Sequence, residues 1–375
     1  MGNMPVSVRV PPSLLPSDGR FGCGPSKVRP AALFSLAGTG RRYLGTSHRQ
    51  AGVRSVVASV RSGLASLFAL PDGYEVVLGV GGSTSFWDAA TFGLVSAQSQ
   101  HLAFGEFGTK FYEAVDAAPF VSASVITSPP GTHGALVATP GVDLYAHPHN
   151  ETSTGVALAP ARPPRADEGT LICIDGTSAA GGLWLDPASV DVYYFAPQKC
   201  FASDGGLWVA LCSPAALARI ASVKASGRYI PPSLDLAVAH DNSRLDQTYN
   251  TPALATLWLL REQLDWMLAH GGLAWSTARC ARSASLLYDW AESSSYASPF
   301  VAKPDERSNV VGTIDLDAAV PYGDVCAVLR ENGVVDIEPY RKLGRNQLRV
   351  GMFPAVEPAD VEALTACIDY VVERL

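Results

Sequence analysis

The stretch VYYFAPQKC, residues 192–200, decides the fold of this chain together with its upstream counterpart LICIDGTS, residues 171–178. Each begins as a short run of apolar and aromatic residues typical of a buried strand, and each continues into polar residues. The first run is followed by Lys199, and the second ends at Asp175. Because lysine and aspartate are rarely buried without a partner, both are candidates for a functional site at strand ends.

Around these two runs, short apolar segments alternate with longer amphipathic ones, which predicts an α/β fold with a largely parallel central sheet. The expected strands are 75–80, 101–104, 122–128, 143–147, 171–175, 192–196 and 207–212. The helices expected between them are 53–70, 84–96, 106–117 and 214–222. Residues 128–141 and 157–169 are rich in proline and polar residues and indicate surface loops, and 227–248 is expected to be another irregular segment.

The pattern changes from about residue 250 onward. The elements expected there are helices at 252–269 and 273–295, a strand at 308–317, a helix at 322–333, strands at 334–339 and 346–353, and a terminal helix from Asp360. This order predicts a smaller α+β domain packed beside the large one. We therefore expect an N-terminal arm over 1–30, a large domain over 31–265 and a small C-terminal domain over 266–375.

Composition narrows the class of partner. The 28 basic and 35 acidic residues give a net charge of −7 without long blocks of like charge, which argues against nucleic acid or a membrane surface as a partner. No apolar stretch approaches the roughly 20 residues that cross a bilayer, and the N-terminal segment does not resemble a signal peptide. The seven cysteines form no CxxC pair or Cys/His cluster, so we expect no metal site and a reducing, cytoplasmic environment.

A glycine-rich segment, GVGGSTSFWDAA at 79–90, follows the first expected strand and opens a helix. Glycines let backbone N–H groups approach a phosphate, and the amino end of a helix favours an anion. Ser83 and Thr84 are the candidate ligands. An ordinary strand-to-helix turn explains this segment equally well when it is considered alone, since it lacks the Walker lysine and a full GxGxxG motif.

Lys199, Asp175 and the glycine-rich segment together suit pyridoxal phosphate. A desolvated lysine amine with a lowered pKa can bind that cofactor covalently, and a buried carboxylate can keep the ring nitrogen protonated. Each residue alone also has a structural explanation, as a lysine reaching the surface or as a carboxylate in a turn. The combination predicts an enzyme.

Four more segments supply small polar or cationic side chains. They are GTSHRQ at 45–50 with His48 and Arg49, HNETSTGV at 149–156 with Asn150 and Thr152, QTYNTP at 247–252 with Asn250 and Thr251, and EPYRKLGRNQLRV at 338–350 with Arg341, Lys342, Arg345 and Arg349. A polar turn or a helix cap explains each of the first three when it is considered alone. Arg349 differs because it lies inside an apolar, strand-like run, and its planar fork matches a carboxylate.

In this order, the motifs resemble the phosphoserine aminotransferase family of fold-type I pyridoxal-phosphate enzymes. The resemblance extends over nearly the whole chain, through FGCGPSKVR, GTSHRQ, GGST, GEF, HNET, IDGTS, APQK, TYNTP and RKLGRNQLRV. It implies that Lys199 binds the cofactor covalently, Asp175 pairs with the ring nitrogen and Phe107 stacks on the ring. It also implies a contact from Thr152 to the ring hydroxyl. The implied phosphate ligands are Ser83, Thr84, Gln198, Asn250 and Thr251, the last two from a neighbouring subunit.

The resemblance further implies a substrate site shared across a homodimer. Arg349 would bind the α-carboxylate, while His48 and Arg49 would reach the distal anionic group of the substrate in the other subunit. Ser83 occupies a position where many family members have arginine, so Lys342 or Arg345 is a candidate to neutralise the substrate phosphate instead. Phe107 occupies a position where other members have tryptophan.

The implied reaction is a reversible ping-pong transamination of L-glutamate with 3-phosphohydroxypyruvate, giving 2-oxoglutarate and O-phospho-L-serine. It would serve L-serine biosynthesis, with pyridoxine biosynthesis as a second role. One alternative is an alanine–glyoxylate or serine–pyruvate aminotransferase, which shares the lysine and the aspartate but needs no second anion site. Another is a protein that kept the fold and lost catalysis.

Overall fold

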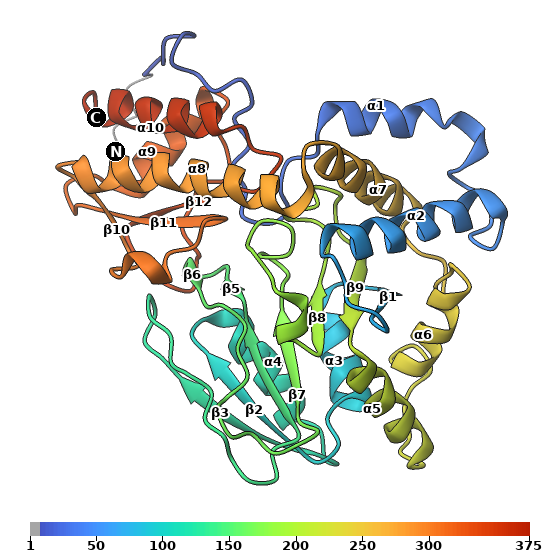
Figure 1. Ribbon diagram of the computed structural model, residues 1–375. Coiled ribbons are helices and arrows are strands. Elements are labelled where there is room, and N and C mark those ends of the chain that lie inside the picture. Colours follow the sequence, from blue (N-terminus) through green and yellow to red (C-terminus); the bar gives the residue numbers. More distant parts are fainter. Residues whose placement is uncertain (1–7) are drawn as a thin grey trace.

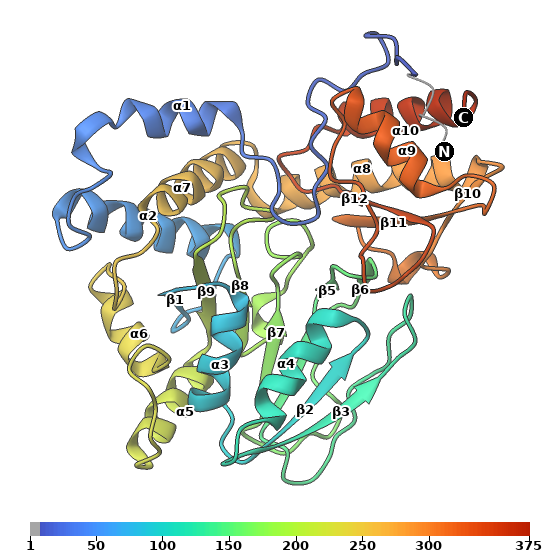
Figure 2. The ribbon, with the colours of Figure 1, turned by 180° about the vertical axis from the view of Figure 1, so that it is seen from behind.

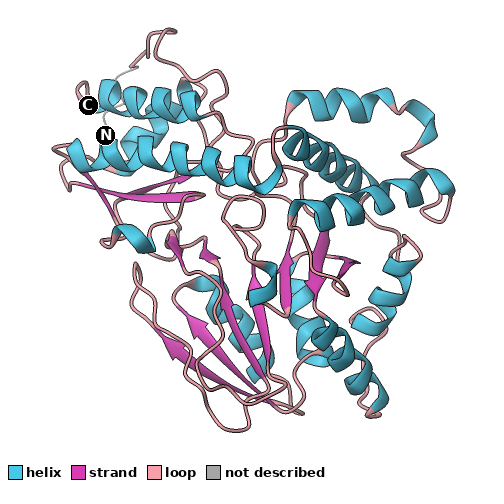
Figure 3. Ribbon diagram, viewed as in Figure 1, coloured by secondary structure: helices cyan, strands magenta, loops and turns pink. Residues whose placement is uncertain are grey.

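Seven strands form the central sheet in the computed structural model, which describes residues 8–375 (Figures 1 and 3). They are β1 Glu75–Val80, β2 Gln98–Ala103, β3 Ser122–Thr127, β4 Leu144–Pro148, β7 Leu171–Asp175, β8 Val192–Phe195 and β9 Leu207–Cys212. Their order is β1-β9-β8-β7-β4-β2-β3; β9 runs antiparallel to β1 and β8, and the other neighbours are parallel. The predicted α/β class and all seven predicted strands are confirmed.

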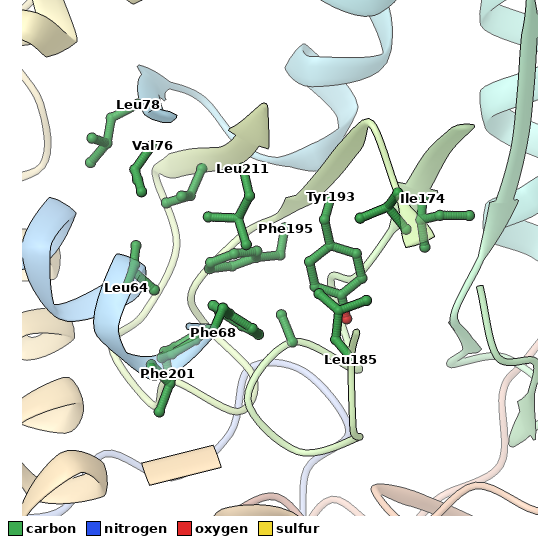
Figure 4. Close-up of a cluster of buried hydrophobic side chains, with 14 of the residues drawn as sticks. Leu64, Phe68, Val76, Leu78, Ile174, Leu185, Tyr193, Phe195, Phe201 and Leu211 are labelled. Atoms are coloured by element: carbon green, nitrogen blue, oxygen red, sulfur yellow. The ribbon is translucent and has the colours of Figure 1, made fainter. Parts of the chain in front are cut away.

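Helices cover both faces of the sheet, because successive side chains of a strand point to opposite sides. On one face, Ile172 and Tyr193 belong to a buried cluster with α2 Ala51–Leu67 and α7 Leu254–Ala269. Figure 4 shows part of this cluster, where Leu64 of α2 lies near side chains from several strands. The opposite face is covered by α3 Ser83–Gly93, α4 Glu106–Asp116, α5 Pro214–Ala225 and α6 Leu236–Arg244 (Figure 2).

The four helices expected in the large domain are confirmed, but the expectation for 227–248 is wrong in part because α6 lies there. The Asp235 carboxylate accepts hydrogen bonds from the backbone N–H groups of Ala237 and Val238, which caps the helix. Leu236 is buried against the sheet and gives the helix an apolar contact. The shorter elements are α1 Pro30–Gly38, the hairpin of β5 Asn150–Glu151 and β6 Val156–Ala157, and 3-10 turns at Gly40–Arg42, Pro187–Ser189 and Pro304–Glu306.

A second, smaller unit contains the antiparallel sheet of β10 Ala297–Pro299, β11 Val311–Leu316 and β12 Gln347–Gly351. Its helices are α8 Gly272–Ser293, α9 Tyr322–Glu331 and α10 Pro358–Val372. The strand expected at 334–339 is wrong: Val335 forms an isolated bridge with Arg20 instead. Asp336 has a φ of +66°, in the left-handed region, and this interrupts the extended backbone that a strand requires.

The N-terminal segment packs on the smaller unit. Val8, Val10 and Phe21 belong to its buried cluster, whereas residues 1–7 of the expected arm lie outside the described residues. Helix α8 contributes to both parts, with Leu273 in the large cluster and Leu287 in the small one. The division into 1–30, 31–265 and 266–375 stays a prediction. Within residues 8–375, no helix is long and apolar enough to cross a membrane.

The topology brings three predicted site segments to one edge of the sheet. Strands β7 and β8 are parallel neighbours, with Asp175 opposite Tyr194, so their carboxyl ends meet. Because β1 and β8 both run antiparallel to β9, β1 ends at the same edge. Residues 81–84, Asp175 and the turn 196–199 therefore lie where ligands bind in open α/β sheets.

Candidate active site

A cavity of about 340 Å³ opens at this edge of the sheet, and Lys199 lies in it. Nine of the candidate residues line the cavity. They are Ser83, Thr84, Phe107, Asn150, Thr152, Asp175, Gln198, Lys199 and Arg349. Residues far apart in the sequence and from both parts of the fold therefore converge on one space.

Lys199 is the buried amine of this cavity, with a residue exposure of 6%. Its Nζ donates a hydrogen bond of 2.7 Å to Oγ1 of Thr152 and lies 5.2 Å from the centre of the Phe107 ring. Burial lowers the pKa of Lys199 to about 8, although the nearby Asp175 acts in the opposite direction. About a tenth of the amine is therefore neutral, and so nucleophilic, at pH 7, which is far more than for a lysine of ordinary pKa.

Asp175 is a buried carboxylate that forms no salt bridge with any residue in the described part of the chain. The backbone N–H of Thr177 donates to its Oδ1 at 2.8 Å. Burial raises the pKa of Asp175, while the hydrogen bonds from Thr177 and the charge of Lys199 oppose this rise. A cationic group bound in the cavity would stabilise the ionised carboxylate.

A chain of hydroxyl groups fixes the acceptor that faces Lys199. Thr152 Oγ1 donates to Ser178 Oγ at 2.9 Å, and Ser178 Oγ donates to the carbonyl oxygen of Asn150 at 3.0 Å. The Asn150 amide also donates to Ser178 Oγ at 2.8 Å. Since each hydroxyl proton has a fixed acceptor, a lone pair of Thr152 is left to point at the Lys199 amine.

The glycine-rich segment ends where α3 begins, and it presents a free helix amino end to the cavity. Gly82 precedes the helix, which has no side-chain cap. Ser83 Oγ lies 2.5 Å from Oγ1 of Thr177, and both residues line the cavity with Thr84. The unpaired N–H groups of a first helical turn and the helix dipole favour a phosphate at this position.

Three buried polar atoms of the cavity lining lack a hydrogen-bond partner among residues 8–375. They are Asn150 Oδ1, Gln198 Oε1 and Arg349 Nε. Buried polar atoms without partners are uncommon in folded proteins and indicate that a ligand completes them. A buried amine, a carboxylate, a helix amino end and unpaired amide and guanidinium groups together fit pyridoxal phosphate and an anionic substrate.

Arg349 is the cation that the smaller unit contributes to the cavity. Its Nη1 donates to the carbonyl oxygen of Thr152 at 3.2 Å, and its guanidinium carbon lies 5.3 Å from the centre of the Tyr340 ring. The other two candidate cations lie outside the cavity lining: Arg345 is paired with Asp315, and Lys342 is paired with Glu106. A substrate contact from Arg345 stays a prediction.

The remaining four predicted residues form a second group on the surface, away from the cavity lining. Thr251 Oγ1 lies 3.1 Å from Nδ1 of His48, and Arg49 donates to Gln247 Oε1 at 2.9 Å. Asn250 is the neighbour of Thr251 in the same loop. The structure therefore brings His48, Arg49, Asn250 and Thr251 together, but not to the Lys199 of their own chain.

Sequence reasoning missed several residues of the lining. They are Cys23, Gly24, Trp87, Thr177, Ser178 and Tyr340. Thr177 and Ser178 could have been found, because they follow Asp175 in the stretch IDGTS. Gly24 has a φ of +140°, and a Cβ there would lie 2.7 Å from Cε of Lys199. Tyr340 carries no sequence signal, since its place depends on how the smaller unit packs.

Comparisons with known proteins agree with this geometry. The aminotransferase class-V family model matches residues 135–337. Phosphoserine aminotransferase from Nocardioides sp. is 60% identical over 374 residues, covering 99% of this chain and 100% of that protein. The enzyme from Rhodococcus jostii is 60% identical over 367 residues, covering 98% of both. Phosphoserine aminotransferase from Cytophaga hutchinsonii has the same fold, with a TM-score of 0.87 at 22% identity over 96% of this chain and 99% of that one.

The sheet, the cavity and the class-V match define a pyridoxal-phosphate-dependent aminotransferase of fold type I. Within that class, identity of 60% over nearly the full length shows that the chain belongs to the phosphoserine aminotransferase family. The predicted family, enzyme class and cofactor are confirmed. The roles of individual site residues stay predictions.

Proposed function

We propose that the chain catalyses the reversible transfer of an amino group from L-glutamate to 3-phosphohydroxypyruvate, giving 2-oxoglutarate and O-phospho-L-serine. The observation that carries this proposal is the buried amine of Lys199 beside Asp175, in a cavity that also contains Arg349. Membership of the phosphoserine aminotransferase family supports the choice of substrates. The reaction belongs to L-serine biosynthesis.

Each group of the cofactor has a counterpart in the lining. Lys199 would hold it covalently, Asp175 would pair with the ring nitrogen, Phe107 would stack on the ring and Thr152 would contact the ring hydroxyl. Its phosphate would bind at the start of α3, through Ser83 and Thr84, and at Gln198. When bound, pyridoxal phosphate supplies an electron-accepting ring and a carbon that carries the amino group between substrates.

Lys199 would also move the proton of the reaction. Once a substrate amine displaces it from the cofactor, its Nζ would be free to carry the proton from the substrate Cα to the cofactor carbon that holds the amino group, and to carry it in the opposite direction in the second half-reaction. A pKa lowered to about 8 by burial suits both steps, because the amine accepts and donates near neutral pH. The hydrogen bond to Thr152 would keep Nζ oriented between the two proton transfers.

Arg349 would bind the α-carboxylate that donor and acceptor share. Its Nε lacks a partner among residues 8–375, and its planar fork suits a bidentate carboxylate contact. The second anion, a γ-carboxylate in glutamate and a phosphate in the acceptor, needs another cation, and His48 and Arg49 do not line the cavity of their own chain.

We propose a homodimer in which a second copy supplies His48 and Arg49 for the distal anion, and Asn250 and Thr251 for the cofactor phosphate. Three large apolar side chains near them in the sequence are exposed, namely Leu44, Leu245 and Tyr249. Large exposed apolar side chains at one surface favour association with another protein. The cavity is completed only when this face meets a second chain.

A coupled assay with purified protein tests this function. With glutamate as donor, 3-phosphohydroxypyruvate should react, and Arg49→Ala should lower kcat/KM for it by about tenfold or more, since a charge-assisted hydrogen bond contributes about 1.5–3 kcal/mol. Arg282→Ala removes an exposed arginine of α8 and serves as the matched control. An unchanged kcat/KM in Arg49→Ala would overturn the distal-anion assignment.

The alternative of an alanine–glyoxylate or serine–pyruvate aminotransferase predicts activity with ketoacids that lack phosphate.

We also propose a cytoplasmic location and a second role in pyridoxine biosynthesis. Growth of a strain that lacks its own enzyme, with and without added serine or pyridoxine, tests each role separately. Rescue without serine but not without pyridoxine would rule out the second role.

A further inference from the structure

Glu151 is a fully buried acid that the chemistry above does not use. Its residue exposure is 0%, and it forms no salt bridge with any residue in the described range 8–375. Four hydrogen bonds reach its carboxylate. Oε2 accepts from the backbone N–H groups of Phe107 and Gly108, both at 3.1 Å, and Oε1 accepts from the N–H and hydroxyl groups of Ser153 at 3.1 and 2.7 Å.

These bonds make Glu151 the cap of α4, although it lies 44 residues from Phe107 in the sequence. Phe107 and Gly108 belong to the first turn of the helix, whose N–H groups have no partner inside it. The residue before the helix is Gly105, which has no side chain to cap it. The carboxylate from the β5 hairpin therefore satisfies donors that the helix cannot satisfy itself, and its charge complements the helix dipole.

Gly105 allows this contact by being small. A Cβ at Gly105 would lie 2.3 Å from Cγ of Glu151 and 2.5 Å from Oγ of Ser153. The hydroxyl of Ser153 also accepts a hydrogen bond of 3.1 Å from the backbone N–H of Glu106. The backbone of 105–108 is therefore held against the Glu151 hairpin at successive residues.

The same backbone carries the ring that faces the cavity. The Phe107 ring lies 5.2 Å from Lys199 Nζ and 6.2 Å from the Tyr340 ring, between centroids in the second case. Because the N–H of Phe107 is hydrogen-bonded to Glu151, the position of this carboxylate determines where α4 begins and where the Phe107 ring lies in the cavity.

We propose that Glu151 is a positioning residue that holds the Phe107 ring at the height required to stack on the cofactor. This inference rests on the proposed role of the cavity. An ionised carboxylate suits the site, because each of its oxygens accepts two hydrogen bonds. A protonated carboxyl would instead direct its own O–H group at one of these donors. Burial raises the pKa of Glu151, and the donors from Ser153 and Gly108 oppose that rise.

Glu151→Gln tests the proposal without changing the size of the side chain. In either orientation of the amide, its NH₂ group replaces an oxygen that accepted two hydrogen bonds and therefore faces two N–H or O–H donors. We expect this repulsion to shift α4 and Phe107 with it. In the full-length holoenzyme we expect the apparent Kd for pyridoxal phosphate to rise about tenfold or more, with a changed visible circular dichroism of the bound cofactor.

Asp235→Asn is the matched control, because it makes the same change from acid to amide at a buried cap, that of α6. It should lower the melting temperature and leave the cofactor Kd and spectrum unchanged. A merely structural role for Glu151 would give the same result as this control, and that outcome would overturn the proposal.

A double-mutant cycle with Phe107→Leu identifies the route of the effect. If Glu151 acts through Phe107, adding Glu151→Gln to Phe107→Leu should change the cofactor Kd by no more than about twofold. A tenfold effect that persists in this background would mean that Glu151 acts through Lys199 or Asp175 instead, and would contradict the proposal.

If Glu151→Gln does not fold, Ser153→Ala can replace it in the double-mutant cycle. It removes the hydrogen bond that the Ser153 hydroxyl donates to Glu151 and the one that this hydroxyl accepts from the backbone N–H of Glu106. The expected change in Kd is then smaller but in the same direction, and no change would overturn the proposal. If the wild-type chain bound no pyridoxal phosphate, the proposed function itself would fail, which is distinct from both outcomes.

Discussion

Lys199 Nζ donates a 2.7 Å hydrogen bond to Thr152 Oγ1, although Lys199 follows β8 of the central sheet and Thr152 lies in the β5–β6 hairpin. The bond matters because a buried amine is free to point in several directions, whereas one anchored to a fixed hydroxyl points in one. Thr152 is fixed in turn by Ser178. The orientation of the amine is thus set by groups beyond the reacting atoms.

The pKa of Lys199 predicts how its reactivity depends on pH. The neutral amine is the nucleophile, so a pKa lowered to about 8 makes the neutral fraction rise and level off at lower pH than for an ordinary lysine. Between about pH 7 and 9, rebinding of pyridoxal phosphate to cofactor-depleted protein should accelerate about tenfold, against about a hundredfold for a lysine of ordinary pKa. Stopped-flow absorbance measures this rate, with Nα-acetyl-lysine as the reference. A hundredfold rise in the protein would contradict the lowered pKa.

Ser178→Ala should lower kcat by about tenfold with little change in KM, because Thr152 loses the acceptor that orients it toward Lys199. The Asn150 amide loses its acceptor as well. The matched control is Ser283→Ala, which removes a buried hydroxyl that has no partner among residues 8–375. Steady-state kinetics at saturating substrate check both variants. An effect on KM alone in Ser178→Ala would be inconsistent with an orienting role.

Gly24→Ala should weaken cofactor binding, because the added Cβ would lie 2.7 Å from Cε of Lys199. A positive φ without the contact is available at Gly227, which has a φ of +81° and no atom within 4 Å of the place that a Cβ would occupy. Gly227→Ala should lower the free energy of unfolding by about 1 kcal/mol and leave cofactor content unchanged. Absorbance of the bound cofactor and thermal melting separate the two effects. Equal cofactor content in both variants would show that the Gly24 contact is unimportant.

Hybrid dimers test whether the site is shared between subunits. In a hybrid dimer, one chain carries Lys199→Ala and the other carries Arg49→Ala. If Arg49 serves the site of the other chain, both changes fall in the same active site, and the second active site of that dimer is intact. Mixed and re-equilibrated chains should then regain about a quarter of wild-type activity, since half the dimers are hybrids with one working site. Differently tagged chains confirm that hybrids form. Absence of any recovery in verified hybrids would place Arg49 in the site of its own chain.

Much of the fold follows from local sequence patterns, because strand runs such as LICID and helices such as 106–117 have one dominant periodicity. The α6 helix was missed because its signal is a single cap, Asp235, in a segment rich in polar residues. The strand expected at 334–339 failed because Asp336 adopts a left-handed conformation that side-chain pattern does not reveal.

The site was predictable where motifs follow strand ends, as at Asp175 and Lys199. It was not predictable where packing between the two parts of the fold decides, as for Tyr340. Local sequence patterns also do not show where His48 and Arg49 lie relative to the cavity of their own chain, which they do not line. Only the family resemblance implies that they serve the other subunit.

The proposed function depends above all on this chain being a transaminase for a phosphorylated ketoacid. A single comparison tests this: kcat/KM for 3-phosphohydroxypyruvate against that for hydroxypyruvate, with glutamate as donor and Lys199→Ala as the inactive control. We predict a preference of at least about a hundredfold for the phosphorylated acceptor, as expected when a doubly charged group is bound by cations built for it. Equal values for the two acceptors would contradict the proposed function.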